Sequence, residues 1–389
     1  MRIFRPLVII FVAIFSLLSF SSCGDGDDPV VPKERTLFMF FPWTGDLTSY
    51  FKRNIEDMEQ AIQSHGLKDQ RVIVYFADSP TSAELFEIAW QNETAVRRPL
   101  KTYETLNTKS SEAIAALLSD IKTIAPARQY SMTIGCHGFG WVESKNSSYV
   151  AAQRARRPQG EYHITRYFGG STPQYQIDID TFRQAIETAG MHFDYILFDD
   201  CYMASIEVAY ELRNTTDVII ASTCEMMGPG LPYKTVGPHL LGTPDYKAAC
   251  DEFFKFYSSY TVPCGTLSVI NCLEVGNMAQ FMKDLNSQTT DLSAQELLSV
   301  QKFDGFYPVI FFDMESYVKT RCRNNTALYN AFARQLQSTV IYEVHTPQYY
   351  SASSGYEDLN TSSGVSISDP SVNNIAAGKK ETSWWKATH

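Results

Sequence analysis

A cysteine and a histidine each follow a short apolar stretch of strand length. Cys201 lies just beyond the stretch 193–198, and His137 lies just beyond the stretch 130–135. A cysteine thiol is mostly protonated at neutral pH, and a neighbouring base or cation is needed to produce the reactive thiolate. A histidine can be that partner. The two residue types therefore predict nucleophilic catalysis by a cysteine, provided that the fold brings them together.

The elements around these two residues predict where they lie. A helical pattern at 204–213 follows Cys201, so this cysteine stands at the carboxyl end of its strand. In an open α/β sheet, ligands bind at that edge. If the strand at 130–135 is a parallel neighbour, His137 emerges at the same edge. We therefore expect His137 and Cys201 to form one site.

Apolar strands alternate with amphipathic helices up to residue 222, and this predicts a mostly parallel sheet with helices on both faces. The residues 85–90 are expected to form a short edge strand, and the polar residues 92–107 a loop. Ser110 or Ser111 caps a helix that Pro126 ends. The other expected strands are 35–41, 71–76 and 218–222, and the other expected helices are 48–65 and 180–189.

Two motifs at these strand ends resemble the clostripain (C11) family of cysteine peptidases. They are His-Gly-Phe-Gly-Trp at 137–141 and the Asp-x-Cys-x-Met-Ala pattern at 199–204. The resemblance extends over most of the chain, through the stretches 37–41, 46–47, 55–58, 364–367 and 384–388. It implies a caspase-like fold: a three-layer α/β/α sandwich with a mostly parallel central sheet, and a C-terminal α+β extension packed on it.

The resemblance also implies the roles of the site residues. Cys201 would attack a peptide carbonyl to form a thioester, and His137 would protonate the leaving amine. The amides of Gly138 and Cys201 would form the oxyanion hole. The predicted function is that of a cysteine endopeptidase. The alternative is a catalytically inert, caspase-like binding module on the cell envelope.

Two acids are candidates for substrate binding. Alternate residues of a strand share a face, so Asp199 points the same way as Cys201 while Asp200 points opposite. The resemblance likewise implies that the acid two residues before the cysteine lines the S1 pocket, which predicts cleavage after Arg or Lys. Asp200 departs from the family pattern, in which a small residue is usual. Glu225 follows the next strand and is a second candidate for binding a cation. In an alternative reading Asp199 is structural and the P1 preference differs.

The N-terminus has the features of a bacterial export signal. Arg2 and Arg5 precede an apolar run at 7–20, which is too short to span a membrane. Small residues before Cys23 resemble a lipoprotein signal, so we expect cleavage after residue 22 and lipidation of Cys23. A plain secretory signal is the alternative. The protein is expected to be anchored by lipid to the cell envelope, at the outer membrane, and acids at 25, 27 and 28 raise the hypothesis of surface exposure.

The remaining chain is expected to divide into a polar tether at 23–34, a caspase-like catalytic core at 35–243 and a C-terminal subdomain of the same peptidase unit at 244–389. The 389 residues are 44% hydrophobic, which is typical of a globular protein. The net charge of −10 and the lack of a long basic run argue against nucleic-acid binding. We expect a monomer whose partners are protein or peptide substrates and the membrane.

No metal site is expected. Adjacent ligands at Cys136 and His137 suit tetrahedral zinc poorly. Calcium is a requirement of some members of the resembled family, but no compact carboxylate loop is visible in this sequence. The eight cysteines include no Cys-x-x-Cys and no disulfide framework, in keeping with a free Cys201.

A long polar insertion at 141–175 contains the basic cluster Arg154, Arg156 and Arg157. Loops of this length are usually functional or disordered. The cluster resembles the internal site at which some members of the family cleave themselves, and we expect self-cleavage there. The alternative is a solvated loop.

Overall fold

The computed structural model describes residues 31–104, 106–146, 149, 152, 163–166, 175–372 and 374–389. The chain divides into two compact units, Met1–Val31 and Pro32–His389, and the second unit contains all the helices and strands described below. The predicted signal at 1–22 and its Cys23 lie outside the described residues, as do Arg154, Arg156 and Arg157.

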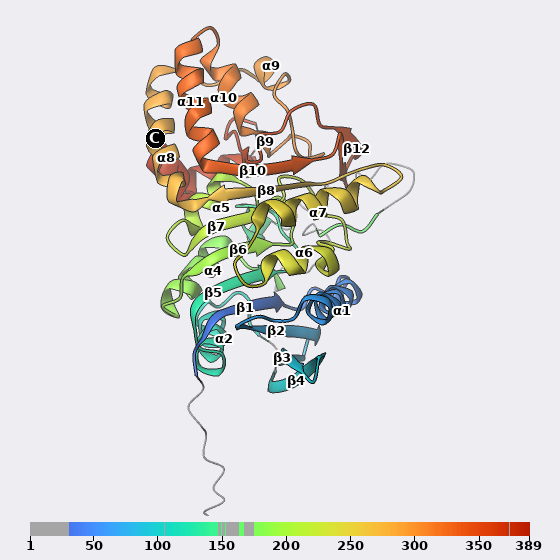
Figure 1. The fold of residues 1–389 in the computed structure, drawn as a ribbon. Coiled ribbons are helices and arrows are strands. Elements are labelled where there is room, and N and C mark those ends of the chain that lie inside the picture. The colour runs from blue at the N-terminus through green and yellow to red at the C-terminus, as the bar shows by residue number, and fades with distance from the viewer. Residues whose placement is uncertain are drawn as a thin grey trace, which may run out of the picture. The chain divides into compact units, whose positions relative to one another are not determined.

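The fold is an α/β sandwich around one large sheet. Within the described residues, this sheet has nine strands in the order β10-β8-β7-β6-β5-β1-β2-β3-β4 (Figure 1). Their bounds are β1 Lys33–Phe41, β2 Gln70–Ser79, β3 Ser82–Gln91, β4 Thr94–Tyr103, β5 Ala127–Ile134, β6 Phe193–Phe198, β7 Thr216–Ala221, β8 Thr266–Asn271 and β10 Val340–His345.

The five central strands β2, β1, β5, β6 and β7 are parallel to one another, and antiparallel strands extend the sheet on both sides. The central strands are buried on both faces, which explains why their sequences are continuous apolar runs rather than alternating ones. This architecture confirms the predicted three-layer α/β/α class with a mostly parallel central sheet.

Helices cover both faces of the sheet. Figure 1 shows α1 (Thr48–His65), α6 (Tyr233–Leu240) and α7 (Tyr246–Ser258) on one side, and α2 (Ser111–Ile124), α4 (Ile179–Thr188) and α5 (Ile206–Leu212) on the other. Helix α1 buries Phe51, Ile55, Met58 and Ile62, at the spacing of one helical face. Of the two predicted capping residues, Ser110 and Ser111, it is Ser110 that caps α2, because its side chain accepts a hydrogen bond from the Ala113 N–H.

The predicted loop at 92–107 is wrong, because most of it forms the strand β4. This strand lies at the edge of the sheet and is largely exposed, so it lacks the apolar residues by which strands are recognised. The turn that leads into it has positive φ angles at Asn92 and Glu93, as a two-residue hairpin loop requires. Consequently 85–90 lies within β3, an inner strand rather than the edge.

The C-terminal half joins the same sheet. Strands β8 and β10 add to its far side, so the sheet continues across the predicted division at 243/244. The remaining elements are α8 Cys272–Gln288, α9 Ala294–Leu297, β9 Phe312–Asp313, α10 Met314–Cys322, α11 Thr326–Thr339, β11 Gln348–Ser351, β12 Gly355–Asp358, β13 Ser366–Ile367, α12 Asn374–Ala377 and α13 Ser383–Thr388. In the part of the chain that the structure describes, none of the helices has the length and apolar character needed to cross a membrane.

Candidate active site

The register of two parallel strands brings His137 and Cys201 to one edge of the sheet. Strands β5 and β6 pair with Ile134 opposite Phe198, and each site residue follows three positions later in its own chain segment. Both side chains are buried. The backbone of Gly138 lies against Cys201, because a Cβ at position 138 would come within 2.4 Å of the Cys201 carbonyl oxygen. Only glycine allows this approach.

His137 is oriented by an acid from a third strand end. Its Nε2 lies 2.7 Å from Oδ1 of Asp46, in the segment between β1 and α1. The other ring nitrogen, Nδ1, is buried and has no hydrogen-bond partner among the described residues. A neutral imidazole that donates from Nε2 to Asp46 keeps the lone pair of Nδ1 free to accept a proton. Asp46 was part of the family resemblance, but the sequence assigned it no role.

The Cys201 thiol is enclosed. Its Sγ accepts a hydrogen bond from the Met226 N–H at 3.1 Å, and the next residue, Tyr202, has a φ of 62°. Burial raises the pKa of the Cys201 thiol well above its ordinary value, and the nearby Glu225 carboxylate adds to the effect. Within the described residues, no hydrogen bond joins Cys201 to His137. This environment favours the protonated thiol.

A piece of the long insertion runs across the site as an added strand. The Gly228 N–H donates to the Ile164 carbonyl at 2.6 Å, and the Arg166 N–H donates to the Met226 carbonyl at 2.7 Å. Between them Thr165 forms an antiparallel bridge with Met227. This is the way in which an extended peptide binds alongside a protein segment, with main-chain hydrogen bonds for affinity and side-chain pockets for specificity.

The carbonyl of Arg166 lies beside the thiol-bearing segment. Its oxygen accepts a hydrogen bond from the Gly138 N–H at 2.9 Å. Gly138 is one of the two expected oxyanion donors, and the amide nitrogen of the other, Cys201, lies next to it: a Cβ on Gly138 would be 2.9 Å from that nitrogen. The peptide carbonyl that follows Arg166 is therefore held where oxyanion donors were expected.

The Arg166 side chain fills a buried pocket that contains Asp199. Its Nη1 lies 2.8 Å from Asp199 Oδ2, and both side chains are wholly buried. The ring of Phe51 lies 5.3 Å from the guanidinium carbon, in cation–π contact. Four further acceptors complete the set: the carbonyls of Asp199 at 3.0 Å, Gly228 at 3.1 Å and Pro229 at 3.2 Å, and Asn54 Oδ1 at 2.7 Å. Four N–H···O hydrogen bonds and one ion pair, to Asp199 Oδ2, thus hold the guanidinium.

Two features of this pocket determine its chemistry. Asp199 Oδ1 accepts the Leu231 N–H at 3.0 Å, which fixes the carboxylate. Burial raises the pKa of Asp199 to about 6, against the opposing effect of the Arg166 cation. Gly230 lines the pocket with φ +66°, and a Cβ there would lie 2.2 Å from Arg166 Nη2 and 2.4 Å from Asp199 Oδ1. An arginine fits only because position 230 has no side chain.

Glu225 does not contact a cation in the described residues. Its Oε2 instead accepts the Thr165 hydroxyl at 2.6 Å, one residue before Arg166. Its Oε1 accepts the hydroxyls of Tyr202 and Ser351 and the N–H of Ala352, each at 2.9 Å. Glu225 therefore faces the residue before the arginine, and its predicted role as a second cation-binding residue stays a prediction.

Asp200 points away from this pocket, as strand alternation predicts. Its Oδ1 accepts the N–H of Cys136 at 2.5 Å, which ties the ends of β5 and β6 together. The seven cysteines from Cys136 onward are free. Among the residues that the structure describes, no group of three or more His, Cys, Asp or Glu could hold a metal ion.

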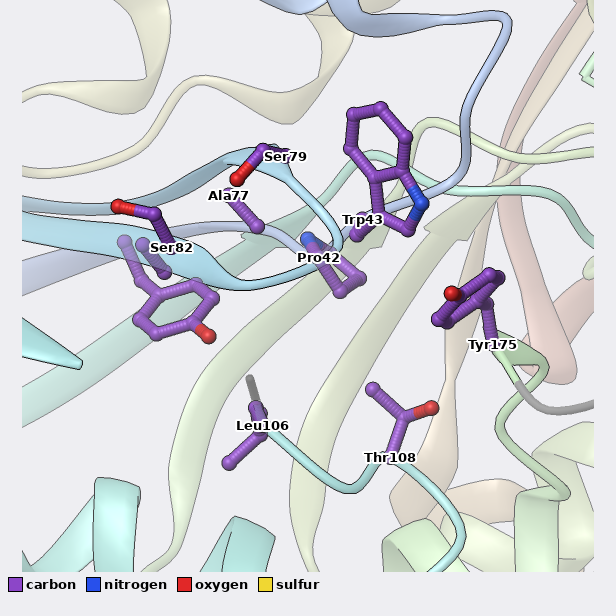
Figure 2. A pocket seen from close by; sticks show the side chains of 10 residues that line it. Pro42, Trp43, Ala77, Ser79, Ser82, Leu106, Thr108 and Tyr175 are labelled. Carbon is purple, nitrogen blue, oxygen red and sulfur yellow. The ribbon is translucent and has the colours of Figure 1, made fainter. Parts of the chain in front are cut away.

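A small hollow lies at the same edge of the sheet, beyond the end of β1. Figure 2 shows Trp43 and Tyr175 on its rim, with Leu106 and Thr108 nearby. It has room for about one water molecule, ≈ 10 Å³. Neither His137 nor Cys201 lines it.

Comparisons with known proteins agree on one family. The sequence matches the Clostripain family over residues 43–361. A secreted C11 cysteine protease from Bacteroides thetaiotaomicron, iotapain, is 44% identical, with a TM-score of 0.85 over 92% of this chain and 100% of that one. An inactive zymogen C11 protease from Parabacteroides distasonis is 26% identical, with a TM-score of 0.77 over 92% and 100%.

A third solved structure contains a peptide. It is a clostripain from Bacteroides thetaiotaomicron in complex with the peptide inhibitor BTN-VLTK-AOMK; it is 48% identical, with a TM-score of 0.55 over 57% of this chain and 99% of that one. No curated protein matches the chain.

Proposed function

The chain belongs to the clostripain family of cysteine peptidases, and from this premise we propose that it is a monomeric endopeptidase that cleaves after arginine or lysine through Cys201 and His137. One observation carries the proposal. Arg166 lies in the site as a P1 residue would, with its side chain on Asp199 and its carbonyl oxygen on the Gly138 N–H. A buried cation pocket beside a cysteine, a histidine and an oxyanion donor is what such an enzyme needs.

The proposed reaction uses these groups in turn. The Cys201 thiol loses its proton to Nδ1 of His137, and the sulfur attacks the P1 carbonyl carbon. The Gly138 and Cys201 amides stabilise the oxyanion. The C–N bond then breaks, the proton on His137 passes to the leaving amine, and a thioester remains. A water molecule, deprotonated by His137, hydrolyses the thioester and returns the proton to the thiol. Asp46 is a positioning residue that holds the imidazole in place.

The pocket favours arginine over lysine at P1. It offers five acceptors to a planar guanidinium, whereas an ammonium group has three N–H donors and a different geometry. The inhibitor bound by the 48% identical clostripain ends, in one-letter code, with lysine after threonine, which supports a basic P1 residue here. Both residues are therefore proposed as substrates, with arginine preferred.

We also propose that the chain cleaves itself after Arg166. This is the basic residue whose carbonyl is held at Gly138. Self-cleavage at Arg154, Arg156 or Arg157 stays a prediction, since those residues lie outside the described part of the chain. In the intact chain the segment ending at Arg166 fills the site and keeps the Cys201 thiol buried. A relative solved as an inactive zymogen supports such a state.

The first prediction concerns the nucleophile and the P1 residue. Fluorogenic peptides that differ only at P1, with Arg, Lys, Leu or Asp, should be hydrolysed in the order Arg, then Lys, with little activity on the others. The Cys201→Ala variant should have no activity above background, because Cys201 is the proposed nucleophile and the neighbouring Cys136 thiol is directed to the Asp200 carboxylate, at 3.6 Å, instead. Folded, reduced protein that has been cut after Arg166, by itself or by added trypsin, and still hydrolyses none of the peptides would instead favour an inert binding module.

A matched pair of glycine variants tests the role of the pocket and controls for backbone strain. Gly230→Ala should abolish the preference for arginine, since the new methyl group would occupy the guanidinium site. Gly66→Ala introduces the same kind of backbone strain, at φ +71°, where no atom lies within 4 Å of the added Cβ. It should leave the preference unchanged. Equal effects of the two substitutions would show that backbone strain, not the pocket, is responsible.

The second prediction is a pH dependence of P1 selection. Asp199 attracts a cation only when it is ionised, and its pKa is raised to about 6 with a cation already beside it. Without that cation the pKa of Asp199 lies higher still, and kcat/KM reports the enzyme with an empty pocket. The ratio of kcat/KM for an arginine peptide to that for its neutral isostere citrulline should therefore be high at high pH and begin to decrease above pH 6, approaching about tenfold per pH unit as the pH falls. The ratio cancels titrations common to both substrates. Asp199→Asn should give a low, pH-independent ratio; a wild-type ratio that is constant between about pH 5 and pH 8 contradicts the role of Asp199.

The third prediction concerns self-cleavage. Incubation of the purified chain should yield two fragments, one of which ends at Arg166, as measured by intact mass and by C-terminal peptide analysis. Cys201→Ala and Arg166→Gln should remain uncut at this position, while Arg166→Lys should be cut more slowly. Cleavage exclusively after Arg154, Arg156 or Arg157, or cleavage at Arg166 in the Cys201→Ala variant, would overturn the assignment.

The fourth prediction follows from the N-terminal sequence. We propose that the protein is exported and anchored to the cell envelope, at the outer membrane, through lipid on Cys23. Expressed in a bacterium that processes lipoproteins, the wild-type chain should sediment with membranes, and Cys23→Ser should shift it to the soluble fraction. Equal distribution of the two proteins would exclude a lipid anchor at this residue.

A further inference from the structure

The residue before Arg166 is recognised as closely as Arg166 itself. Thr165 is 5% exposed, whereas the preceding Ile164 is 38% exposed. Its backbone pairs with Met227, which sets its side chain at a fixed position beside Glu225. A bound peptide that takes the same path therefore places its P2 side chain against Glu225, and its P3 side chain toward solvent.

Glu225 is arranged to accept one more donor. Three donors hold Oε1: the hydroxyls of Tyr202 and Ser351 and the amide of Ala352. The Thr165 hydroxyl is the donor to Oε2 in the described residues, at 2.6 Å. The carboxylate is thus fixed from behind, and one of its oxygens points at the P2 position. A buried acceptor of this kind is costly to leave unpaired.

The geometry distinguishes among P2 side chains. Threonine and serine supply a hydroxyl at the right distance, whereas valine has the shape of threonine without the donor. Lysine and arginine carry donors too, but the 2.6 Å contact with a short side chain leaves no space for a long one while Tyr202 and Ser351 keep their places. The hydrogen-bond partners of Glu225 among the described residues are Thr165, Tyr202, Ser351 and Ala352. Burial raises the pKa of the Glu225 carboxyl, and these four donors oppose the rise.

We propose that Glu225, held by Tyr202, Ser351 and Ala352, is the specificity-determining residue of the S2 subsite and selects a hydroxyl-bearing P2 residue, threonine or serine, before the basic P1 residue. This inference rests on the proposed endopeptidase function. It assigns two elements far apart in the chain to one subsite: the segment after β7, which carries Glu225, and the hairpin β11–β12, which supplies Ser351 and Ala352.

The test uses four fluorogenic peptides built on the chain's own sequence from His163 to Arg166. They are His-Ile-Thr-Arg, His-Ile-Ser-Arg, His-Ile-Val-Arg and His-Ile-Lys-Arg, each compared by kcat/KM. With the processed wild-type enzyme, threonine and serine should be favoured over valine by about 10- to 100-fold, the range that an unpaired buried acceptor gives. The lysine peptide should be at least as poor as the valine peptide.

The variant Glu225→Gln tests whether Glu225 is responsible for this P2 preference. It keeps the size of the side chain but replaces the charged acceptor with a neutral amide. A threonine hydroxyl meets this amide only through the weaker hydrogen bond between uncharged groups, so the preference for threonine over valine should shrink by about five- to tenfold. The preference for arginine over citrulline at P1 should persist, because Asp199 is untouched. If Glu225→Gln does not fold, Ser351→Ala, which removes one of the three donors to Oε1, should reduce the threonine preference in part.

The outcomes separate the two proposals. Hydrolysis of all arginine peptides with equal efficiency for threonine and valine overturns the S2 assignment and leaves the proposed function in place. A lysine peptide that is preferred over threonine also overturns it, since Glu225 would then act as a cation site. A threonine preference that is unchanged in Glu225→Gln assigns the selection to another residue. Failure to hydrolyse any peptide overturns the endopeptidase proposal and this inference with it.

Discussion

The buried ion pair between Arg166 and Asp199 is the interaction on which this end of the sheet depends. A carboxylate that is wholly removed from water is costly unless it is paired, and breaking such a pair costs about 3–5 kcal/mol. Here the guanidinium joins four parts of the chain: the insertion itself, helix α1 through Asn54, the end of β6 through Asp199, and the turn at 228–230. The pocket is thus organised around a cation, and an empty pocket leaves Asp199 without its partner. This demand for a replacement cation is the physical argument behind the proposed basic P1 residue.

The order and direction of the strands in the central sheet are enough to bring the proposed reacting residues together. Parallel strands β5, β1 and β6 end at one edge, and the residues just past their ends are His137, Asp46 and Cys201. Two apolar runs each stop shortly before His137 or Cys201, and parallel pairing of these runs, with Ile134 opposite Phe198, brings the two residues together. Their juxtaposition could therefore be predicted from the sequence. The alternation of a strand likewise distinguished Asp199 from Asp200. These features are local in sequence or follow from the rules of parallel sheets.

The parts that could not be predicted depend on contacts between distant segments. Arg166 is one of several basic residues in a polar insertion, and nothing local distinguishes it from Arg154 or Arg157. Glu225 could be placed at the sheet edge, but its partners come from Thr165 and from Ser351, 126 residues further on. Strand β4 was missed because an exposed edge strand has no apolar pattern. Each of these features depends on the tertiary structure, which determines the pocket that a side chain occupies and the surface that faces water.

The segment ending at Arg166 is attached to the enzyme whose site it occupies, and this has a kinetic consequence. A ligand that is covalently attached to its binding protein can have an effective concentration of about millimolar order at its own site, whatever the concentration of the protein. Cleavage after Arg166 would not remove it, because the new C-terminus still belongs to the strand-forming residues 164–166. If the chain cleaves itself there, as proposed, each incoming substrate would compete with a resident product. The apparent KM of such an enzyme would increase with the stability of the resident strand. A substitution that weakens this strand would therefore lower the apparent KM, even if the substituted residue does not contact the substrate.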